Sequence, residues 1–373
     1  MSAAGSADVV VIGSGIVGLG AAYAAVRRGL SVIVVDRTDA PVGASIRNFG
    51  HLCIGAQTGV ARRHADTARE LWLQLARDAG FWLRESGTLI AARHADELAV
   101  LESAASDGGI RMLETAHLLA LAPLRPEGVL GGALIEPDLQ VNPREAATAI
   151  VRHLVSLGVE FRVRTAATAV ATGRVGTTRG SIAAGTVVVA VNHDIDQLLP
   201  EAAERIGIQR CALDMMRVVA DLPAPLTAPL LTGWSLVRYG RFADVPETAA
   251  LRARLHAERP ELAALDLNQM YTQLPDGSLI LGDSHAKAVQ PGPFQPEGAF
   301  EAFLDEACEL FQADRFRVLE RWQGVYASGP EDFLDERPAD GVLALAATTG
   351  IGMTCGLGLA ESALSAHFQE ALA

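Results

Sequence analysis

The chain has 373 residues, 50% of them hydrophobic, and a formal net charge of −13 at pH 7. This length is enough for two or three domains, and the acidic balance disfavours a nucleic-acid partner. No apolar run approaches the ~20 residues of a membrane span, and residues 1–7 are uncharged, unlike a signal or transit peptide. We therefore expect a cytoplasmic protein with no membrane span.

The cysteines are spread along the chain without a C-x-x-C pair. They are Cys53, Cys211, Cys308 and Cys355. This spacing is typical of free thiols in a reducing compartment. We expect no zinc site and no other metal site.

The first 36 residues contain a pattern typical of dinucleotide binding. The β-branched run 8–12 predicts a buried parallel strand, and the glycines of 13–18 follow it in the spacing G-x-G-x-x-G. An apolar helix is predicted over 19–28, and a second buried strand over 31–36 ends at Asp36. Strand, glycines, helix, strand and acid together predict a dinucleotide site.

Each glycine of this motif has a physical reason. Gly13 permits the tight turn, Gly15 lets the backbone approach a pyrophosphate, and Gly18 lets the helix pack closely on the strand. The free N–H groups at the helix start favour phosphate, and Asp36 is placed to accept a hydrogen bond from a ribose hydroxyl. The cofactor contacts expected from this unit are Gly13, Ser14, Gly15, Ile16, Val17, Gly18, Asp36 and Arg37.

The loop 43–50 indicates which dinucleotide is bound. It is rich in small and polar residues, where a nicotinamide domain would move directly into another helix and strand. Its sequence, Gly-Ala-Ser-Ile-Arg-Asn-Phe-Gly, resembles a segment of the D-amino-acid oxidase superfamily of FAD enzymes. In that superfamily the segment runs under the isoalloxazine ring. Extended to His51 and to 55–57, it resembles a narrower subgroup associated with phosphonate breakdown. The resemblance implies cofactor contacts by Gly43, Ala44, Ser45, Arg47, Asn48, Phe49 and Gly50.

The middle of the chain alternates predicted helices and strands. Helices are predicted over 60–81, 96–105, 143–157 and 297–311. Strands are predicted over 87–92, 129–135, 159–163, 186–190, 236–239, 268–271 and 278–282. The resemblance implies that 163–170 reaches towards the cofactor, so Val170 is an expected contact.

These elements predict an α/β fold in two parts. One is a Rossmann-type FAD-binding domain, and the other is a discontinuous α+β substrate-binding domain built on a mixed or antiparallel sheet. The expected FAD-binding domain comprises 1–80, 141–210 and 318–373. The expected substrate-binding domain comprises 81–140 and 211–317 and caps the site.

A second glycine turn lies near the C-terminus. A buried strand is predicted over 341–347, then the turn 348–354, then an apolar helix over 357–371. The turn resembles the superfamily's C-terminal flavin contact, where N–H groups at a helix start stabilise the negative charge of reduced flavin. Cys355 lies outside a recognised linkage motif, so we expect non-covalent FAD. The contacts implied here and in the segment 321–326 are Trp322, Gly324, Gly350, Ile351, Gly352, Met353 and Thr354.

The chemistry we expect is oxidation of a C–N bond, because a flavin carries the redox step and the protein positions the amine. A substrate with an anionic end needs a cationic partner, and the arginine fork matches carboxylate or phosphonate. The candidates for catalysis and substrate binding are His51, Arg217, Arg238 and Tyr271, with both arginines on expected cap strands. Further candidates for the pocket are Arg47, Tyr239 and His285.

The subgroup resemblance implies a small anionic amine substrate, such as 2-aminoethylphosphonate or its N-methyl derivative. It would become an imine that hydrolyses to an aldehyde or keto product, with dioxygen or another electron acceptor. Three alternatives stay open. They are oxidation of a small amino acid (glycine, sarcosine or a D-amino acid), a nicotinamide-dependent dehydrogenase, and a non-catalytic or electron-transfer flavoprotein.

Overall fold

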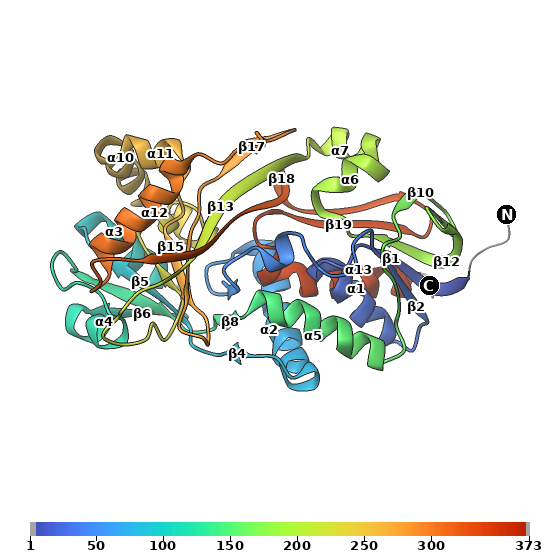
Figure 1. Cartoon of the computed structure of the whole chain (residues 1–373), viewed down its shortest axis with the longest axis horizontal. Coiled ribbons are helices and arrows are strands. Elements are labelled where there is room, and N and C mark those ends of the chain that lie inside the picture. The colour runs from blue at the N-terminus through green and yellow to red at the C-terminus, as the bar shows by residue number, and fades with distance from the viewer. Residues whose placement is uncertain (1–4, 107, 371–373) are drawn as a thin grey trace.

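One continuous sheet connects the two halves of the molecule in the computed structural model, which describes residues 5–106 and 108–370 (Figure 1). In this part of the chain the sheet has 16 strands. Residues 1–4 and 371–373, which the predicted FAD-binding domain includes, lie outside the described residues. None of the described helices is both long enough and apolar enough to cross a membrane.

One half of the sheet is parallel. Its strands lie in the order β9 (Glu160–Arg162), β2 (Val32–Val35), β1 (Ser6–Ile12), β12 (Gly180–Val189) and β19 (Val342–Thr349). The end of β1 and all of β2 are runs of valine and isoleucine that are fully buried, as expected at the centre of a parallel sheet. The helices that pack together on one face are α1 (Ile16–Val26), α2 (Gly59–Ala79), α5 (Pro143–Ser156) and α13 (Gly352–Glu370).

Smaller elements complete this half. The other face of the parallel strands is covered by the hairpin β10 (Ala167–Ala171) and β11 (Arg174–Thr177), by the turn η2 (Asn192–Asp194), and by α6 (Ile195–Leu198) and α7 (Pro200–Ile206). A separate small sheet contains β3 (His51–Leu52), β8 (Leu139–Val141) and β4 (Leu83–Arg84). The turn η1 (Ala44–Ile46) lies in the loop before β3.

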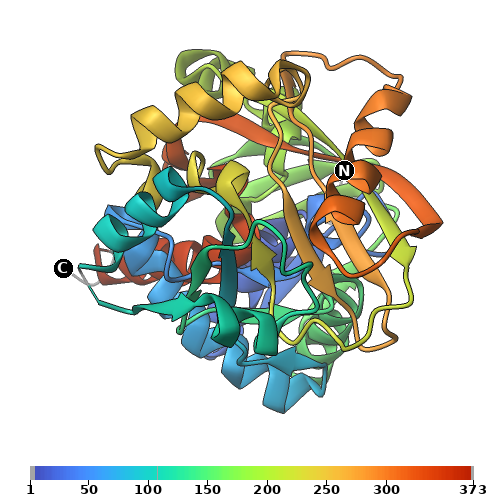
Figure 2. The ribbon, with the colours of Figure 1, turned by 90° about the vertical axis from the view of Figure 1, so that its left-hand side faces the viewer.

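The other half of the sheet is antiparallel except at one pair of strands. It contains β6 (Ile110–Glu114), β7 (Gly131–Ile135), β5 (Thr88–Ala92), β14 (Leu230–Leu231), β15 (Met270–Gln273), β16 (Leu279–Gly282) and β13 (Gln209–Val219), with β17 (Ala286–Ala288) paired to β13. Figure 2 looks onto this half and shows its helices around the sheet. They are α3 (Ala95–Ala105), α4 (Thr115–Leu121), α8 (Gly233–Leu236), α9 (Gly240–Ala243), α10 (Thr248–Glu258), α11 (Pro260–Ala264) and α12 (Glu297–Leu310).

A single long strand joins the two halves. β18 (Arg317–Ala339) spans 23 residues and pairs with β13 near its start and with β19 further along. The register shifts within both pairings, and Figure 1 shows the strand crossing the middle of the molecule. Because the same backbone belongs to both halves, the position of one half relative to the other is set by ordinary strand pairing.

Most predicted elements are present, with two differences. The predicted strand 236–239 is wrong: α8 ends at Leu236, and the next residues form a turn before α9. The C-terminal helix begins at Gly352, five residues earlier than predicted, so the glycine turn itself forms its first turn. Both differences place backbone differently around the cavity described next.

Candidate active site

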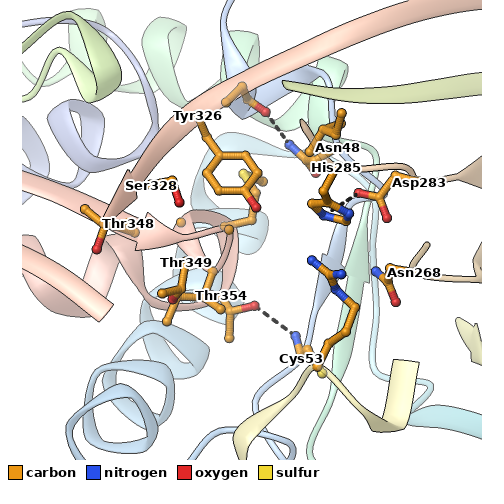
Figure 3. Close-up of a pocket in the computed structure, with 18 of the residues that line it drawn as sticks. Asn48, Cys53, Asn268, Asp283, His285, Tyr326, Ser328, Thr348, Thr349 and Thr354 are labelled. Atoms are coloured by element: carbon orange, nitrogen blue, oxygen red, sulfur yellow. Dashed lines mark hydrogen bonds and ion pairs between the residues drawn. The ribbon is translucent and has the colours of Figure 1, made fainter. Parts of the chain in front are cut away.

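A cavity of about 650 Å³ lies at the carboxyl ends of the parallel strands, between them and the antiparallel half. Its walls include the starts of α1 and α13, the loop 44–49, parts of β13 and β18, and the turn between α8 and α9. In Figure 3, Tyr326 faces Asp283 and His285 across this space. Ligands of open α/β sheets bind outside the carboxyl ends of the strands, and this volume is typical of a cofactor or small-molecule site.

The glycines at the start of α1 have the geometry expected of a phosphate loop. Gly13 has a φ of +103°, which side chains rarely adopt, and a Cβ on Gly18 would overlap the Gly13 carbonyl oxygen. By contrast, a Cβ on Gly15 would approach only the Ser45 hydroxyl, at 3.2 Å. The first two glycines named are therefore needed for the turn and its packing, and the third leaves the backbone open to a ligand. We call residues 13–18 the glycine end of the cavity.

Asp36 supports this end from behind. Its Oδ2 accepts hydrogen bonds from the Ser14 backbone N–H and hydroxyl, at 2.7 and 2.6 Å. Its Oδ1 accepts two more from the N–H and hydroxyl of Thr38, at 2.8 and 2.7 Å. The carboxylate therefore holds the glycine turn, and a ribose hydroxyl would share it with these donors. The neighbouring Arg37 pairs with Asp194 at 2.7 Å.

The loop before β3 is tied across the glycine end. The Ser45 hydroxyl accepts a hydrogen bond from the Ile16 N–H at 2.8 Å. The Asn48 side chain donates to the Ala44 carbonyl at 2.8 Å and accepts from the Gly50 N–H at 2.7 Å, which keeps the loop compact. These bonds hold the loop close to the start of α1, where both line the cavity.

The second helix start lies on the other side of the cavity. Gly350 has a φ of +81°, and a Cβ there would lie 3.2 Å from the ring of Tyr326. The Thr354 hydroxyl accepts a hydrogen bond from the Cys53 N–H at 3.0 Å, so the first turn of α13 is bound to the chain near β3. No acidic residue lies in that turn. Its free N–H groups therefore favour an electron-rich group in the cavity.

Four charged or polar side chains from the antiparallel half form the opposite wall, and we call Arg238, Asp266, Asp283 and His285 the cap cluster. Arg238 lies in the turn after α8, its side chain 20% exposed, and its Nη1 donates to the Asp266 carboxylate at 2.6 Å and carbonyl at 3.0 Å. Burial opposes the charge on Arg238, but the carboxylates of Asp266 and Asp283 outweigh it and hold its pKa above the usual value.

The other two members of the cap cluster touch each other. The Nε2 of His285 lies 3.5 Å from Asp283 Oδ2, and its Nδ1 lies 2.9 Å from the Asp266 carbonyl oxygen. Burial raises the pKa of Asp283 to about 7, although the charge of Arg238 opposes the rise. Burial and the charge of Arg238 lower the pKa of His285 to about 3. At neutral pH the histidine is therefore uncharged.

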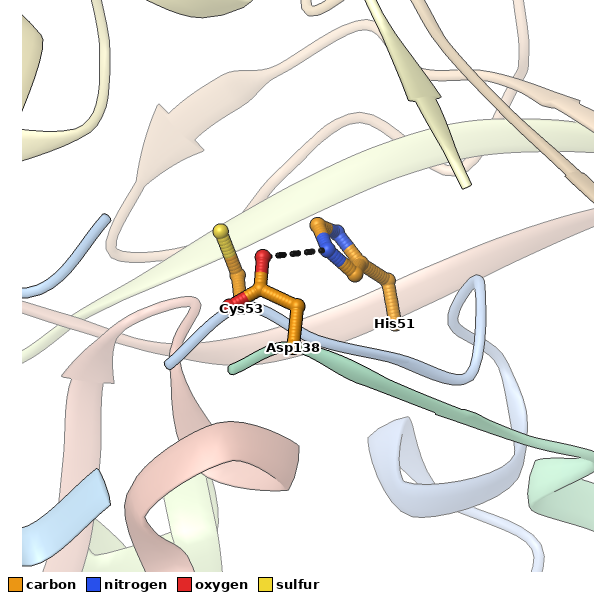
Figure 4. A group of neighbouring side chains, drawn as sticks. All are labelled: His51, Cys53 and Asp138. Atoms are coloured by element: carbon orange, nitrogen blue, oxygen red, sulfur yellow. Dashed lines mark hydrogen bonds and ion pairs between the residues drawn. The ribbon is translucent and has the colours of Figure 1, made fainter. Parts of the chain in front are cut away.

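A separate group of buried side chains lies where β3 begins (Figure 4). His51 Nε2 lies 2.6 Å from the Thr88 hydroxyl and 3.4 Å from Asp138, and Thr88 donates to Asp138 at 2.7 Å. Asp138 also accepts from the Gly55 N–H at 2.6 Å. Potential ligand atoms of His51, Cys53 and Asp138 lie within 4.8 Å of one another. Because hydrogen bonds already occupy both carboxylate oxygens, we interpret the group as a network that orients His51 at the cavity wall.

Most of the predicted site residues line the cavity. From the cofactor motifs these are Gly15, Ile16, Val17, Ala44, Ser45, Arg47, Asn48, Phe49, Gly324, Gly350, Ile351, Gly352, Met353 and Thr354. The candidates His51, Arg238, Tyr239 and His285 line it as well. Gly13, Ser14, Gly18, Asp36, Arg37, Gly43 and Gly50 adjoin these walls without lining the cavity.

Two predicted substrate residues lie elsewhere. Arg217 is on β13, but its guanidinium pairs with Asp276 and Glu320, at 3.3 and 3.4 Å, outside the cavity. Tyr271 is buried in the core of the antiparallel half, where its ring meets Phe311 edge-on at 4.9 Å. Both predictions are corrected: Tyr271 points from β15 into the core, and Arg217 lies on β13 beyond the end of the cavity.

Two predicted cofactor residues are also displaced from the cavity. Val170 lies in β10 and packs with the apolar residues behind the parallel strands. Trp322 lies in β18, and the guanidinium carbon of Arg144 lies over its ring, 5.1 Å from the ring centroid. Neither side chain lines the cavity. Trp322 lies on the same face of β18 as Gly324 and Tyr326, but it is nearer the start of the strand, where the cavity does not reach.

Several residues of the wall that carries the cap cluster were not predicted from the sequence. Asp266, Asn268, Asp283 and Lys287 all line the cavity and were not assigned a role. A weak signal existed, because Gly282-Asp-Ser-His285 precedes the only lysine of the chain. Nothing in that spacing shows that the turn folds over a cavity, since the contacts it makes are with residues about 20 positions away.

Comparison with known proteins agrees with this architecture. A 65-residue segment is 46% identical to one subunit of the anaerobic glycerol-3-phosphate dehydrogenase of Escherichia coli (strain K12), and it covers 17% of this chain and 12% of that protein. Over 208 residues the chain is 21% identical to the D-amino acid dehydrogenase of Helicobacter pylori, covering 41% of this chain and 51% of that enzyme. The matches thus span no more than about half the length of these relatives.

The fold and the family are shown by longer matches. Glycine oxidase from Bacillus cereus superposes with a TM-score of 0.79 at 18% sequence identity, covering 98% of this chain and 95% of that one, which confirms the predicted fold class. Residues 8–365 match the DAO family, described as FAD dependent oxidoreductase. The nicotinamide alternative is therefore wrong, and FAD is the cofactor. The chain belongs to the DAO family of FAD-dependent oxidoreductases.

Proposed function

We propose that the chain oxidises the C–N bond of a small amine that carries an anionic group, and that an aminophosphonate is its preferred substrate. The observation that carries this proposal is Arg238. Within the described part of the chain, both side-chain hydrogen bonds of Arg238 are made by Nη1 to Asp266. Arg238 lines the cavity, and an arginine fork matches the paired oxygens of a carboxylate or phosphonate.

The cavity fits FAD at both of its helix starts. The open backbone at Gly15 and the N–H groups of α1 would hold the pyrophosphate, since a Cβ at Gly15 would fill space beside Ser45. The loop 44–49 and the first turn of α13 would hold the flavin ring. Bound there, FAD supplies the acceptor for a hydride from the substrate. We propose that it is held non-covalently, because Cys355 is buried against the Ala61 carbonyl and does not line the cavity.

Two cations at the cap wall support a doubly charged anion. Arg238 and Lys287 both act on the charge of Asp266 and of His285, so they lie near the same end of the cavity. A phosphonate with two negative charges would use both cations, whereas a carboxylate would need only one. This reasoning, with the subgroup resemblance of the loop 43–51, favours 2-aminoethylphosphonate or its N-methyl derivative.

A small amino acid is the runner-up substrate. Arg238 also suits a carboxylate, and two similar proteins are named for this chemistry, the glycine oxidase of Bacillus cereus and the D-amino acid dehydrogenase of Helicobacter pylori. Glycine, sarcosine and a D-amino acid therefore belong in the same experiment.

The test is anaerobic reduction of the protein's own flavin by each amine, measured as the loss of the flavin's visible absorbance. We expect 2-aminoethylphosphonate or its N-methyl derivative to bleach the flavin at lower concentration than glycine, sarcosine or D-alanine. Faster reduction by an amino acid would move the substrate to the runner-up class. If none of these amines reduces the flavin, the chain is an electron-transfer or non-catalytic flavoprotein and the proposal is wrong. Readmitting dioxygen to the bleached protein then shows whether dioxygen or another compound is the acceptor.

A further inference from the structure

Asp283 is a buried carboxyl group in the cavity wall that the proposed function has not yet used. It follows β16, and its backbone exchanges hydrogen bonds with Asn268, at 2.7 and 2.8 Å. These bonds fix the main chain while the side chain, 5% exposed for the whole residue, lines the cavity. Figure 3 shows it beside His285 and across from Tyr326.

One oxygen of this carboxyl is without a partner. Among the described residues, Asp283 Oδ1 is buried and makes no hydrogen bond. Removing a carboxylate oxygen from water without replacing its hydrogen bonds is costly. Such an atom at a cavity wall is therefore complementary to a donor that a ligand brings.

The contact of the other oxygen, Oδ2, with His285 is best explained if the Asp283 carboxyl carries a proton. The Asp266 carbonyl can only accept, so His285 Nδ1, at 2.9 Å, carries the hydrogen. The neutral ring then presents a lone pair at Nε2 to Asp283 Oδ2, 3.5 Å away. Two acceptors repel unless the carboxyl is protonated. The raised pKa of Asp283, about 7, agrees with a carboxyl that exchanges a proton near neutral pH.

The charges around Asp283 leave it a place for a cation. Arg238 is the cation that acts on it directly, and that group is already bonded to Asp266. Several other titratable and polar groups surround Asp283 and its immediate neighbours. They are Cys211, Arg238, Tyr239, Asp266, Asn268, His285, Lys287 and Tyr326.

We propose that Asp283 binds the ammonium group of the substrate and accepts its proton, which deepens the proposed function and rests on it. An N–H bond of the ammonium breaks, its electron pair stays on nitrogen, and the proton moves to a carboxylate oxygen of Asp283. The neutral amine that results has the lone pair needed to support loss of a hydride from its carbon. Arg238 then holds the anionic end of the same molecule.

The test measures proton release on binding of tert-butylammonium to the FAD-loaded protein. This probe has no hydrogen on its amine-bearing carbon, so it cannot be oxidised. Calorimetry in buffers of different ionisation enthalpy gives the number of protons released. At pH 6 the free Asp283 carboxyl is mostly protonated and must release that proton to bind an ammonium ion, so we expect about 0.9 of a proton released per probe bound. At pH 8.5 the carboxyl is already ionised, and we expect almost no proton release. The affinity should be about tenfold higher at pH 8.5.

Two variants separate Asp283 from the rest of the cavity. Asp283→Asn keeps the size of the side chain and should abolish both the proton release at pH 6 and the pH dependence of affinity. Asp332→Asn is the matched control, since Asp332 also lines the cavity but is exposed and bonded to Thr349 at 3.0 Å. It should release the same number of protons as the parent protein.

The inference is wrong if the parent protein binds no tert-butylammonium, if it binds without proton release at pH 6, or if Asp283→Asn releases as many protons as the parent. These results differ from failure of the proposed function, which would be the absence of flavin reduction by any oxidisable amine. Binding and proton release at pH 6 are both measured on the parent protein, so the inference stays testable even if Asp283→Asn does not fold.

Discussion

The two ends of the cavity are built in different ways. The glycine end, residues 13–18, lines the cavity with a stretch of backbone, from Gly15 to Val17, at the start of α1. The cap cluster presents side chains from three separate turns between residues 238 and 285. A backbone site depends on the path of the chain, so a single methyl group can destroy it. A side-chain site depends on charge, so it can lose function while the fold remains.

The largest effect is expected from Gly18→Ala at the glycine end. The added Cβ would overlap the Gly13 carbonyl oxygen, and overpacking of this kind costs about 1–3 kcal/mol or more. We expect protein without FAD or insoluble protein, measured as the ratio of flavin to protein absorbance. Gly298→Ala, in α12, is the control because a Cβ there meets nothing within 4 Å, and it should keep FAD. Full flavin content in Gly18→Ala would contradict the close packing described here.

The next effect is expected at the cap cluster, in activity and not in folding. Arg238→Met removes the fork while keeping much of the stem, and loss of a buried charge partner costs about 3–5 kcal/mol. We expect kcat/KM for the aminophosphonate to fall on the order of a hundredfold or more, with unchanged flavin content. Arg217→Met is the matched control, because Arg217 pairs with Asp276 and Glu320 outside the cavity. Equal losses in the two variants would show that the anion is not bound by Arg238.

A smaller effect is expected from Asp36→Ala, which tests whether the glycine end needs its support. Loss of charge-assisted hydrogen bonds to Ser14 and to the ribose should cost about 1.5–3 kcal/mol of FAD binding. This corresponds to roughly a tenfold to hundredfold weaker affinity, measured as FAD loss on dilution and dialysis. Asp39→Ala removes a charge of the same sign from an exposed neighbour and should retain FAD. If Asp36→Ala also retains it, Asp36 holds neither the turn nor the cofactor.

The smallest effect concerns the pH dependence of stability, to which the two acid–base groups of the cap cluster contribute in opposite directions. Folding raises the pKa of Asp283 from 3.8 to about 7, so its contribution to stability falls as pH rises through that interval. Folding lowers the pKa of His285 from 6.5 to about 3, so its contribution rises with pH there. The two slopes oppose each other between about pH 4 and pH 6.5.

Removing either group should expose the slope of the other. Between pH 4 and pH 6.5, we expect Tm to rise more steeply with pH in Asp283→Asn than in the parent protein, and to rise less or fall in His285→Gln. The expected differences are about 2 °C, measured by thermal unfolding in matched buffers. Parallel Tm profiles for the three proteins would show that these groups do not titrate as described.

Local pattern predicted the parallel half of the fold well and the antiparallel half less well. Runs such as 9–12 and Val32–Val35 indicate buried strands, because they are β-branched and have no polar face to expose. The sequence of 236–239 also predicts a strand. In the structure these residues are the end of α8 and the turn after it, because tertiary contacts override a weak local preference. The length of β18 could not be predicted either, because its residues are held by strands from both halves.

The sequence by itself determined the glycine end and the turn before α13. Their function depends on backbone conformation, which Gly13, Gly18 and Gly350 control locally. Only the tertiary structure decided that Arg238 lines the cavity and Arg217 does not. Arg217 lies on β13 beyond the end of the cavity, whereas Arg238 lies in the turn after α8, which folds over the cavity. The pairing of Asp283 with His285 was likewise decided by the folding of one turn over the cavity, because burial there sets which group holds the proton.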